Sequence, residues 1–240
     1  MLDKIRTSRR GFVQASGSLT LAFALAPSLP RVAAAAGDPA ELPGNLRRNP
    51  MLNSWITVNT DSTVVLKIGK VELGQGTMTS AAQVAADELY IDIDQLDVIS
   101  GDTWMSPNEG TTAGSGSAPG CMPAVQHAAA EVRQLLVELA AERLGADAAS
   151  LSLDNGTITA PDGASVTYGE LVEGLDLERQ ATGDPVALKP VEEHRYIGQS
   201  VPRLDIPDKV LGNARFVRGP IAVPAGPNGV AHAATMWSSM

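Results

Sequence analysis

The sequence is poor in the residues that build disulfides, metal centres and stacking platforms. It has one cysteine, Cys121, which excludes an internal disulfide and any multi-cysteine metal or iron–sulfur site within this chain. Its three histidines, His127, His194 and His232, lie far apart without the spacing of metal ligands, so we expect them at the surface or at caps. Aromatic residues make up only 4% of the chain, which argues against stacking of nucleic-acid bases.

Positive charge is also scarce outside the N-terminal segment. The net charge is −9, although residues 1–36 carry five basic residues and one acidic residue. The rest of the chain is therefore more acidic than the total indicates, and such a surface repels phosphate backbones and anionic lipid. We expect neither nucleic acid nor a membrane surface as a partner. With 240 residues, 44% of them hydrophobic, the chain can form one large or two small domains with a sizeable core.

The N-terminus has the pattern of an export signal. A basic start is followed by an apolar stretch at 19–29 and by small residues up to Ala36. This order predicts a signal peptide over residues 1–36, whose apolar stretch is too short to span a membrane as a mature helix. The segment Ser8-Arg9-Arg10-Gly11-Phe12-Val13 resembles a twin-arginine signal, which implies export of a folded protein to the periplasm. We expect cleavage after Ala36 and a linker over residues 37–50.

A glycine turn joins a predicted strand to a predicted helix. Residues 55–58 and 63–68 are β-branched runs that predict a hairpin, and residues 77–90 have the apolar spacing of an amphipathic helix. Gly74, Gln75 and Gly76 lie between them, with Thr77 at the helix start. The glycines and the helix N-terminus predict a cradle for a phosphate or a polar ring, because backbone N–H groups can approach a ligand closely there. On its own such a turn is usually only a turn.

A second loop, at residues 105–120, is rich in serine, threonine and glycine. It follows a predicted strand at 96–99 and leads into a predicted helix at 123–143. Its Ser115, Gly116 and Ser117 suit a loop that wraps a polar, phosphorylated ligand, but a flexible surface loop explains the composition equally well. The two loops converge on one anion site if the helices that they open lie side by side.

The remaining segments predict small β elements and a change of domain. The Asn155-Gly156 turn predicts a hairpin of 151–153 with 157–159, and residues 166–172 predict a strand that passes into a short helix. On the helix at 77–90, we interpret Asp87 and Glu88 as solvated surface rather than as an acid/base pair. Prolines recur beyond Gly183, so we place a boundary between residues 51–183 and 184–240.

The order of these segments carries a resemblance to a known family. Residues 71–76, 82–89, 98–103 and 112–117 together look like the molybdopterin-binding subunit of the xanthine dehydrogenase and aldehyde oxidase family. With the twin-arginine start, the chain is similar to the beta subunits of the isoquinoline 1-oxidoreductase branch. The resemblance implies an α+β fold, with mixed small sheets and two packed helices in a molybdopterin-binding domain. Residues 196–216 resemble the opening of an α/β hammerhead domain, which the chain leaves incomplete.

The resemblance also implies a cofactor, a reaction and partners. The cofactor is a molybdenum–molybdopterin dinucleotide, of the cytosine type in this branch, and the reaction is hydroxylation of an N-heterocycle or an aldehyde with oxygen from water. Carried over by position, Gly74, Gln75, Gly76 and Thr77 face the pterin, and Ser115, Gly116 and Ser117 form a hydroxyl-rich second loop. The implied partners are a 2Fe–2S small subunit, a c-type cytochrome and the remainder of the large subunit.

Three functions stay open from the sequence. The family's catalytic glutamate near the C-terminus has no counterpart here, so we predict no catalytic residue in this chain. The chain is then either the cofactor-binding part of a periplasmic molybdenum hydroxylase or a truncated, catalytically inactive exported fragment. An exported sugar-binding module is the third reading, but only Trp55, Trp104 and Trp237 offer a tryptophan face for stacking a sugar.

Overall fold

The computed structural model describes residues 41–173 and 178–212. The predicted signal peptide, the start of the predicted linker and residues 213–240 of the predicted second domain lie outside the described residues. Within them, one core of aliphatic and alanine side chains surrounds the fully buried Trp55. The predicted mixture of helices with small sheets is confirmed.

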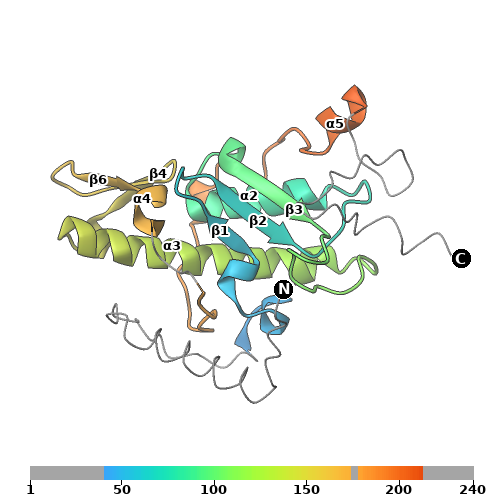
Figure 1. The fold of residues 1–240 in the computed structure, drawn as a ribbon, viewed down its shortest axis with the longest axis horizontal. Helices are drawn as coiled ribbons and strands as arrows, with labels where there is room; N and C mark the ends of the chain where they lie inside the picture. Colours follow the sequence, from blue (N-terminus) through green and yellow to red (C-terminus); the bar gives the residue numbers. More distant parts are fainter. Residues whose placement is uncertain (1–40, 174–177, 213–240) are drawn as a thin grey trace, which may run out of the picture. The chain divides into compact units, whose positions relative to one another are not determined.

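The first sheet has three strands in the order β1-β2-β3 (Figure 1). β1 (Ile56–Val58) pairs antiparallel with β2 (Val64–Ile68), which confirms the predicted hairpin, and β2 pairs in parallel with β3 (Leu96–Ser100). Alternate residues of β2 are buried, as expected for a strand with one face on the core. Parallel neighbours need a crossover, and α2 (Thr77–Leu89) provides it. The glycine turn therefore lies at the carboxyl end of β2.

Helices α2 and α3 (Met122–Leu144) pack against each other. α2 starts after Gly76, whose φ of 84° is left-handed, and α3 ends at Gly145, whose φ is 64°. Both facing surfaces are rich in alanine, which lets helix axes approach closely. The buried alanines are Ala81, Ala82, Ala85 and Ala86 on α2, and Ala124, Ala128, Ala129, Ala130 and Ala140 on α3. The two predicted helices therefore do lie side by side.

A second sheet forms the other end of the described core. β4 (Ser152–Asp154), β5 (Thr157–Thr159) and β6 (Ser165–Thr167) are antiparallel, and the predicted Asn155-Gly156 turn is confirmed by positive φ angles of 47° and 72°. α4 (Tyr168–Val172) follows β6 directly, with a capping box between Thr167 and Glu170. The buried hydroxyl of Tyr168 donates to the carbonyl of Leu89 at 2.7 Å, which ties this sheet to the end of α2.

Short 3₁₀ turns connect these elements. They are η2 (Leu46–Arg48), η3 (Leu52–Ser54), η4 (Ile93–Gln95), η6 (Ala148–Ser150) and η7 (Val191–Glu193). The turn η5 (Ser117–Cys121) is π-helical and leads straight into α3. α5 (Ile206–Leu211) is the last described helix, and none of its residues is buried.

The predicted linker is wrong for residues 41–50. Leu42 and Leu46 are buried in the core, and the backbone N–H of Asn45 donates to the carbonyl of Gly120 at 2.9 Å. The sequence suggested a linker because of its prolines and its two adjacent arginines, but two leucines are enough to anchor the segment beneath the start of α3. The predicted boundary near residue 184 stays a prediction.

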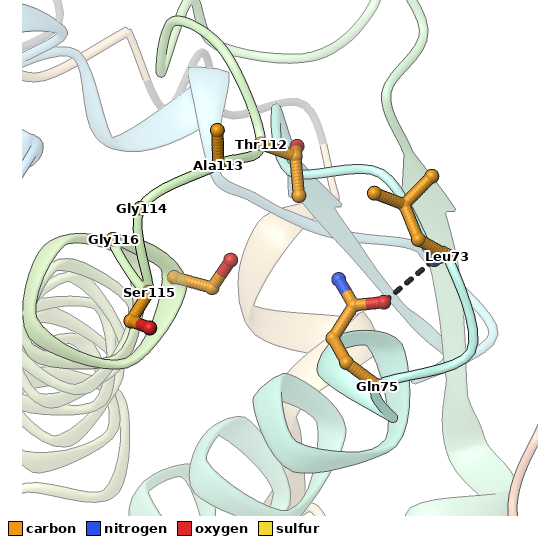
Figure 2. Close-up of a pocket in the computed structure, with 8 residues that line it drawn as sticks. Leu73, Gln75, Thr112, Ala113, Gly114, Ser115 and Gly116 are labelled. Atoms are coloured by element: carbon orange, nitrogen blue, oxygen red, sulfur yellow. Dashed lines mark hydrogen bonds between the residues drawn. The ribbon is translucent and has the colours of Figure 1, made fainter.

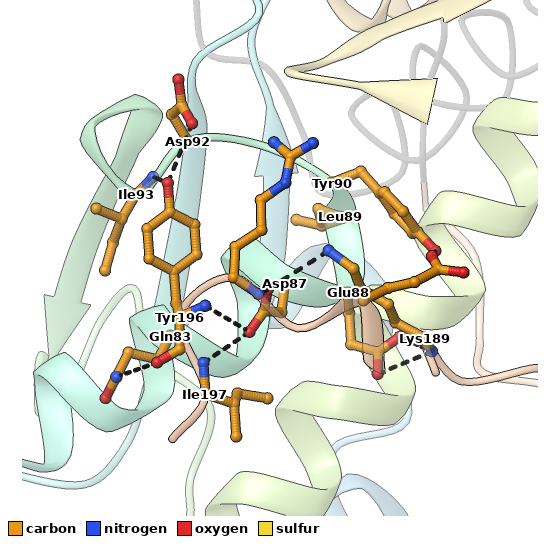
Figure 3. A network of polar contacts seen from close by, with 12 residues as sticks. Gln83, Asp87, Glu88, Leu89, Tyr90, Asp92, Ile93, Lys189, Tyr196 and Ile197 are labelled. Atoms are coloured by element: carbon orange, nitrogen blue, oxygen red, sulfur yellow. Dashed lines mark hydrogen bonds and ion pairs between the residues drawn. The ribbon is translucent and has the colours of Figure 1, made fainter. Parts of the chain in front are cut away.

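The interpretation of Asp87 and Glu88 as solvated surface is also wrong, since both side chains are fully buried. The Asp87 carboxylate accepts from the backbone N–H groups of Arg195, Tyr196 and Ile197 at 2.7, 3.1 and 2.8 Å (Figure 3). Glu88 accepts from the backbone N–H of Lys189 and from the guanidinium of Arg133. These acids therefore fasten the segment around residues 189–197 to α2.

Candidate functional site

The glycine turn and the hydroxyl-rich loop line one pocket of about 300 Å³ (Figure 2). One side is formed by Leu73 and Gln75, at the end of β2. The other side is formed by residues 112–117, just before α3. The structure thus brings together Gln75, Ser115, Gly116 and Ser117 from the predicted site. Gly74, Gly76 and Thr77 lie beside it on the same turn, and the Thr77 side chain is buried.

The loop at residues 112–117 lines this pocket and, in the described part of the chain, carries donors without an acceptor. Within the described residues, the hydroxyls of Ser115 and Ser117 and the backbone N–H groups of Gly114 and Ser115 donate to no acceptor. Gly114 and Ser115 have left-handed φ angles of 60° and 57°, and a side chain at Gly114 would meet open space. The loop is therefore shaped as an open set of hydroxyl and amide donors, which suits a polar or anionic ligand.

Gln75 is folded back onto its own turn. Its Oε1 accepts from the backbone N–H of Leu73 at 2.6 Å, and its Nε2 donates to the carbonyl of Val71 at 2.9 Å. A glutamine amide has two N–H donors and two acceptor lone pairs, so one of each remains for a ligand. The side chain is exposed, and the two internal bonds fix its orientation across the pocket from the second loop.

The predicted anion cradle at the start of α2 is already filled by Glu72. One carboxylate oxygen accepts from the backbone N–H groups of Gly74 and Gly76 at 2.7 and 3.0 Å, and the other accepts from Met78 at 3.2 Å. Burial opposes ionisation of Glu72, but these three N–H groups outweigh it and lower its pKa. The turn is thus a cradle for the chain's own carboxylate, and the donors open to a ligand lie on the opposite loop.

A buried pair holds the opposite loop against β2. The Lys70 ammonium donates to the carbonyls of Glu109 and Thr111 at 2.9 and 3.1 Å. The Glu109 carboxylate in turn accepts from the backbone N–H of Gly69 and from the amide of Asn45. Further along, the Thr112 hydroxyl accepts from the backbone N–H of Val71 at 2.9 Å. Together these contacts fix the spacing between the two walls of the pocket.

Cys121 lies beneath this loop. Its thiol is fully buried, and burial together with the neighbouring Glu109 carboxylate raises its pKa. The side chain therefore stays a protonated thiol and packs as a small apolar residue. Among the described residues no group of three or more His, Cys, Asp and Glu side chains can hold a metal ion.

Sequence reasoning missed Glu72, Lys70, Glu109 and Thr112 as parts of the site. For Glu72 a local signal existed, because a carboxylate two residues before a glycine turn can reach the N–H groups of that turn. For Lys70 the signal was a lysine two residues after the end of a strand with one buried face. Lys70 and Gly69 are each about forty positions from Glu109 in sequence, and no local pattern connects these residues.

No helix in the described part of the chain is long and apolar enough to cross a bilayer. This finding concerns residues 41–173 and 178–212 alone.

Comparison with known proteins identifies a family. The family described as molybdopterin cofactor-binding domain matches residues 15–199. A nicotinate dehydrogenase subunit from Pseudomonas putida is 37% identical over 163 residues, which are 68% of this chain and 14% of that protein. The beta subunit of isoquinoline 1-oxidoreductase from Brevundimonas diminuta is 32% identical over 254 aligned positions, which cover 89% of this chain and 32% of that protein.

A solved structure is also similar. CO dehydrogenase from Oligotropha carboxidovorans matches with a TM-score of 0.45 and 26% identity, over 57% of this chain and 18% of that one. The chain thus spans a third or less of the length of these relatives. From the family match, which extends over most of the sequence, we conclude that the chain belongs to the molybdopterin cofactor-binding domain family of the xanthine dehydrogenase and aldehyde oxidase type.

Proposed function

We propose that the pocket between Gln75 and the loop at residues 112–117 binds the molybdopterin cofactor of a molybdenum hydroxylase. The observation that supports this assignment is that Gln75 lines one pocket together with Ser115, Ser117 and Gly114, whose hydroxyl and N–H donors bond to no acceptor within the described residues. Such a set matches a ligand that carries both a polar heterocycle and phosphate oxygens.

The residues present fit such a group. The remaining donor and acceptor of Gln75 match the edge of a pterin, which also carries both kinds of group. The hydroxyls and N–H groups of the second loop match phosphate oxygens, and the Glu72 carboxylate keeps phosphate away from the start of α2. When bound, the cofactor supplies the redox chemistry. The residues of this chain bind and orient it.

The wider function follows the family. We infer that the chain is the cofactor-binding part of an enzyme that hydroxylates an N-heterocycle or an aldehyde with oxygen from water. The names of the nicotinate and isoquinoline relatives support an N-heterocycle, and their designation as subunits supports a partner such as a 2Fe–2S protein. A cytosine dinucleotide form of the cofactor, and a c-type cytochrome and the rest of a large subunit as partners, belong to the same proposal. The twin-arginine pattern at Arg9 and Arg10 supports a periplasmic location.

Substitution of Gln75 tests the cofactor assignment. We expect Gln75→Ala to lower the molybdenum and pterin content of the complete, exported assembly without unfolding it. Ser117→Ala should lower the pterin content as well, since this hydroxyl has no partner within the described residues and its removal breaks no internal contact. The measurement is pterin fluorescence and metal analysis of the purified protein.

Gln134→Ala is the matched control, because Gln134 is an exposed glutamine on α3 that bonds only Glu138 within the described residues. It should leave the cofactor content unchanged. Wild-type content in both Gln75→Ala and Ser117→Ala would refute the assignment of this pocket, and a wild-type assembly without pterin would refute the proposed function itself.

A further inference from the structure

We propose that Glu72 and Arg203 are positioning residues for cofactor binding. In this proposal Arg203 holds the turn at residues 72–78 in the conformation that binds the cofactor. This inference rests on the proposed function of the pocket. Glu72 and Arg203 are 131 positions apart, and neither is among the residues that line the pocket.

The Glu72 carboxylate determines the shape of the turn. It binds the N–H groups of Gly74, Gly76 and Met78, and its side chain is only 7% exposed. Gly74 and Gly76 have left-handed φ angles of 108° and 84°, with open space where a side chain would be. Flexible glycines in open space are not held by packing, so the turn depends on these hydrogen bonds for its conformation.

Arg203 binds both the carboxylate and the turn that the carboxylate holds. Its Nη2 donates to Glu72 Oε1 at 3.2 Å, and its Nη1 donates to the carbonyl of Gly74 at 2.7 Å. Within the described residues it is the one cation paired with Glu72. Without Arg203, the nearly buried Glu72 carboxylate would keep its three N–H donors but lose its counter-charge. A buried charge without a partner is destabilising.

Arg203 is itself held in place. Asp205 accepts from its Nε and Nη2 at 2.9 and 2.8 Å, a two-point contact that fixes the plane of the guanidinium. The chain on both sides of Arg203 is attached to α2, since Gln83 donates to the carbonyl of Tyr196 at 2.6 Å and Thr79 accepts from the N–H of Leu204 at 3.1 Å. The guanidinium is thus presented to the turn by a segment that α2 anchors at several points.

The consequence is a chain of contacts that ends in the pocket. Arg203 stabilises Glu72, Glu72 holds the N–H groups around Gln75, and the turn orients the Gln75 amide. Loss of Arg203 should therefore loosen residues 72–78 while the hydrophobic core, to which no hydrogen bond of its side chain runs within the described residues, stays folded. Cofactor binding then has to order the turn again, which weakens it.

The test compares Arg203→Gln with Arg203→Lys and Lys209→Gln in the full chain, expressed in a host that makes molybdopterin. Arg203→Gln removes the charge, Arg203→Lys keeps it, and Lys209→Gln removes the other cation bound to Asp205. The readouts are hydrogen exchange of the amides at 72–78, pterin content and the melting temperature. For Arg203→Gln we expect faster exchange and a loss of pterin affinity of about tenfold, as for a lost hydrogen bond to a charged group.

Arg203→Lys should restore both properties in part, because it keeps the charge but not the guanidinium fork, and Lys209→Gln should leave both unchanged. Unaltered hydrogen exchange at 72–78 in Arg203→Gln would show that Arg203 does not hold the turn. Faster exchange with unaltered pterin content would show that Arg203 is not a positioning residue for the cofactor. A wild-type protein without any pterin would refute the proposed function, but the exchange data would still decide whether Arg203 holds the turn.

Discussion

Lys70 and Glu109 join two segments through backbone groups rather than through an ion pair with each other. The Lys70 ammonium donates to the carbonyl of Glu109 at 2.9 Å, while the carboxylate of Glu109 accepts from the N–H of Gly69, the residue before Lys70, at 2.7 Å. Both side chains are buried. This reciprocal arrangement ties the end of β2 to the loop that forms the second wall of the pocket.

Lys70→Met should release that loop. Methionine has a similar volume but no donor, so the carbonyls of Glu109 and Thr111 lose two charge-assisted bonds. We expect a loss of about 2–3 kcal/mol in the free energy of unfolding, and faster hydrogen exchange at residues 109–117. Urea unfolding and exchange measurements check both effects.

Lys67→Met is the control for Lys70→Met. Lys67 also donates to two oxygens, those of Asn53 and Thr57, but it projects from the other face of β2. Its loss should leave exchange at residues 109–117 unaltered. Equal exchange in the two variants would show that Lys70 does not hold the loop.

Gly69→Ala should distort the same junction by a steric route. An added Cβ would lie 2.1 Å from the carbonyl oxygen of Pro107 and 2.9 Å from the backbone N of Glu109, so backbone has to move. We expect a destabilisation of about 1–3 kcal/mol, as for other overpacked sites, together with weaker cofactor binding.

Gly145→Ala is the comparison, because its Cβ would meet open space and its cost of about 1–2 kcal/mol comes from the left-handed φ alone. Gly145→Ala should lower the melting temperature and leave the pterin content unchanged. Reduced pterin content in Gly145→Ala would indicate that the reduced pterin content of Gly69→Ala comes from general destabilisation alone.

The elements of the fold that follow from local patterns could be predicted. The β-branched runs gave the hairpin of β1 and β2, the Asn155-Gly156 turn gave that of β4 and β5, and Gly145 marked the end of α3. The proximity of the two loops could also be predicted, given two adjacent helices. The hairpins and the end of α3 depend on residues that are near one another in sequence, whereas the proximity of the loops follows only once α2 and α3 lie side by side.

The buried acids could not be predicted in that way. Asp87 and Glu88 carry the polar signature of a solvated helix face, and the groups that satisfy Asp87 are backbone N–H groups about 108–110 positions later. Backbone donors have no sequence signature. Glu72 differs, because its partners are the N–H groups of its own turn and a local pattern could have indicated them, although the predicted occupant of that cradle was a ligand.

Asp87→Asn should destabilise the chain strongly. The three backbone N–H groups of residues 195–197 bind both oxygens of the Asp87 carboxylate, whereas an asparagine would turn its NH₂ group toward some of these donors. The substitution would also leave the buried Lys189 ammonium without its counter-charge. We expect a loss of about 3–5 kcal/mol, as for a buried pair that loses one partner. Asp97→Asn, at an exposed position of β3, should cost less than about 0.5 kcal/mol. Chemical unfolding at neutral pH measures both, and equal values would contradict the role of Asp87 in fastening the segment at 189–197.

Acidification should weaken the same attachment. Burial raises the pKa of Asp87, but the N–H groups of Arg195, Ile197 and Tyr196, with Lys189, outweigh it and hold the pKa below the ordinary 3.8. The Arg203 and Lys209 side chains lower the pKa of Asp205 to about 2. Because both folded-state values are depressed, the stability that these carboxylates contribute is fully present above the ordinary 3.8 and is lost as the pH falls through the folded-state values.

The free energy of unfolding should therefore be lower at about pH 3 than at about pH 6, and this difference should shrink in Asp87→Asn because asparagine does not titrate. Urea unfolding of both proteins at the two pH values provides the measurement. Asp97→Asn should keep the wild-type difference, since its exposed carboxylate has no partner among the described residues. A pH dependence in Asp87→Asn as large as that of the wild type would show that the acid sensitivity comes from other carboxylates, and that the three N–H groups at 195–197 do not bind an ionised Asp87.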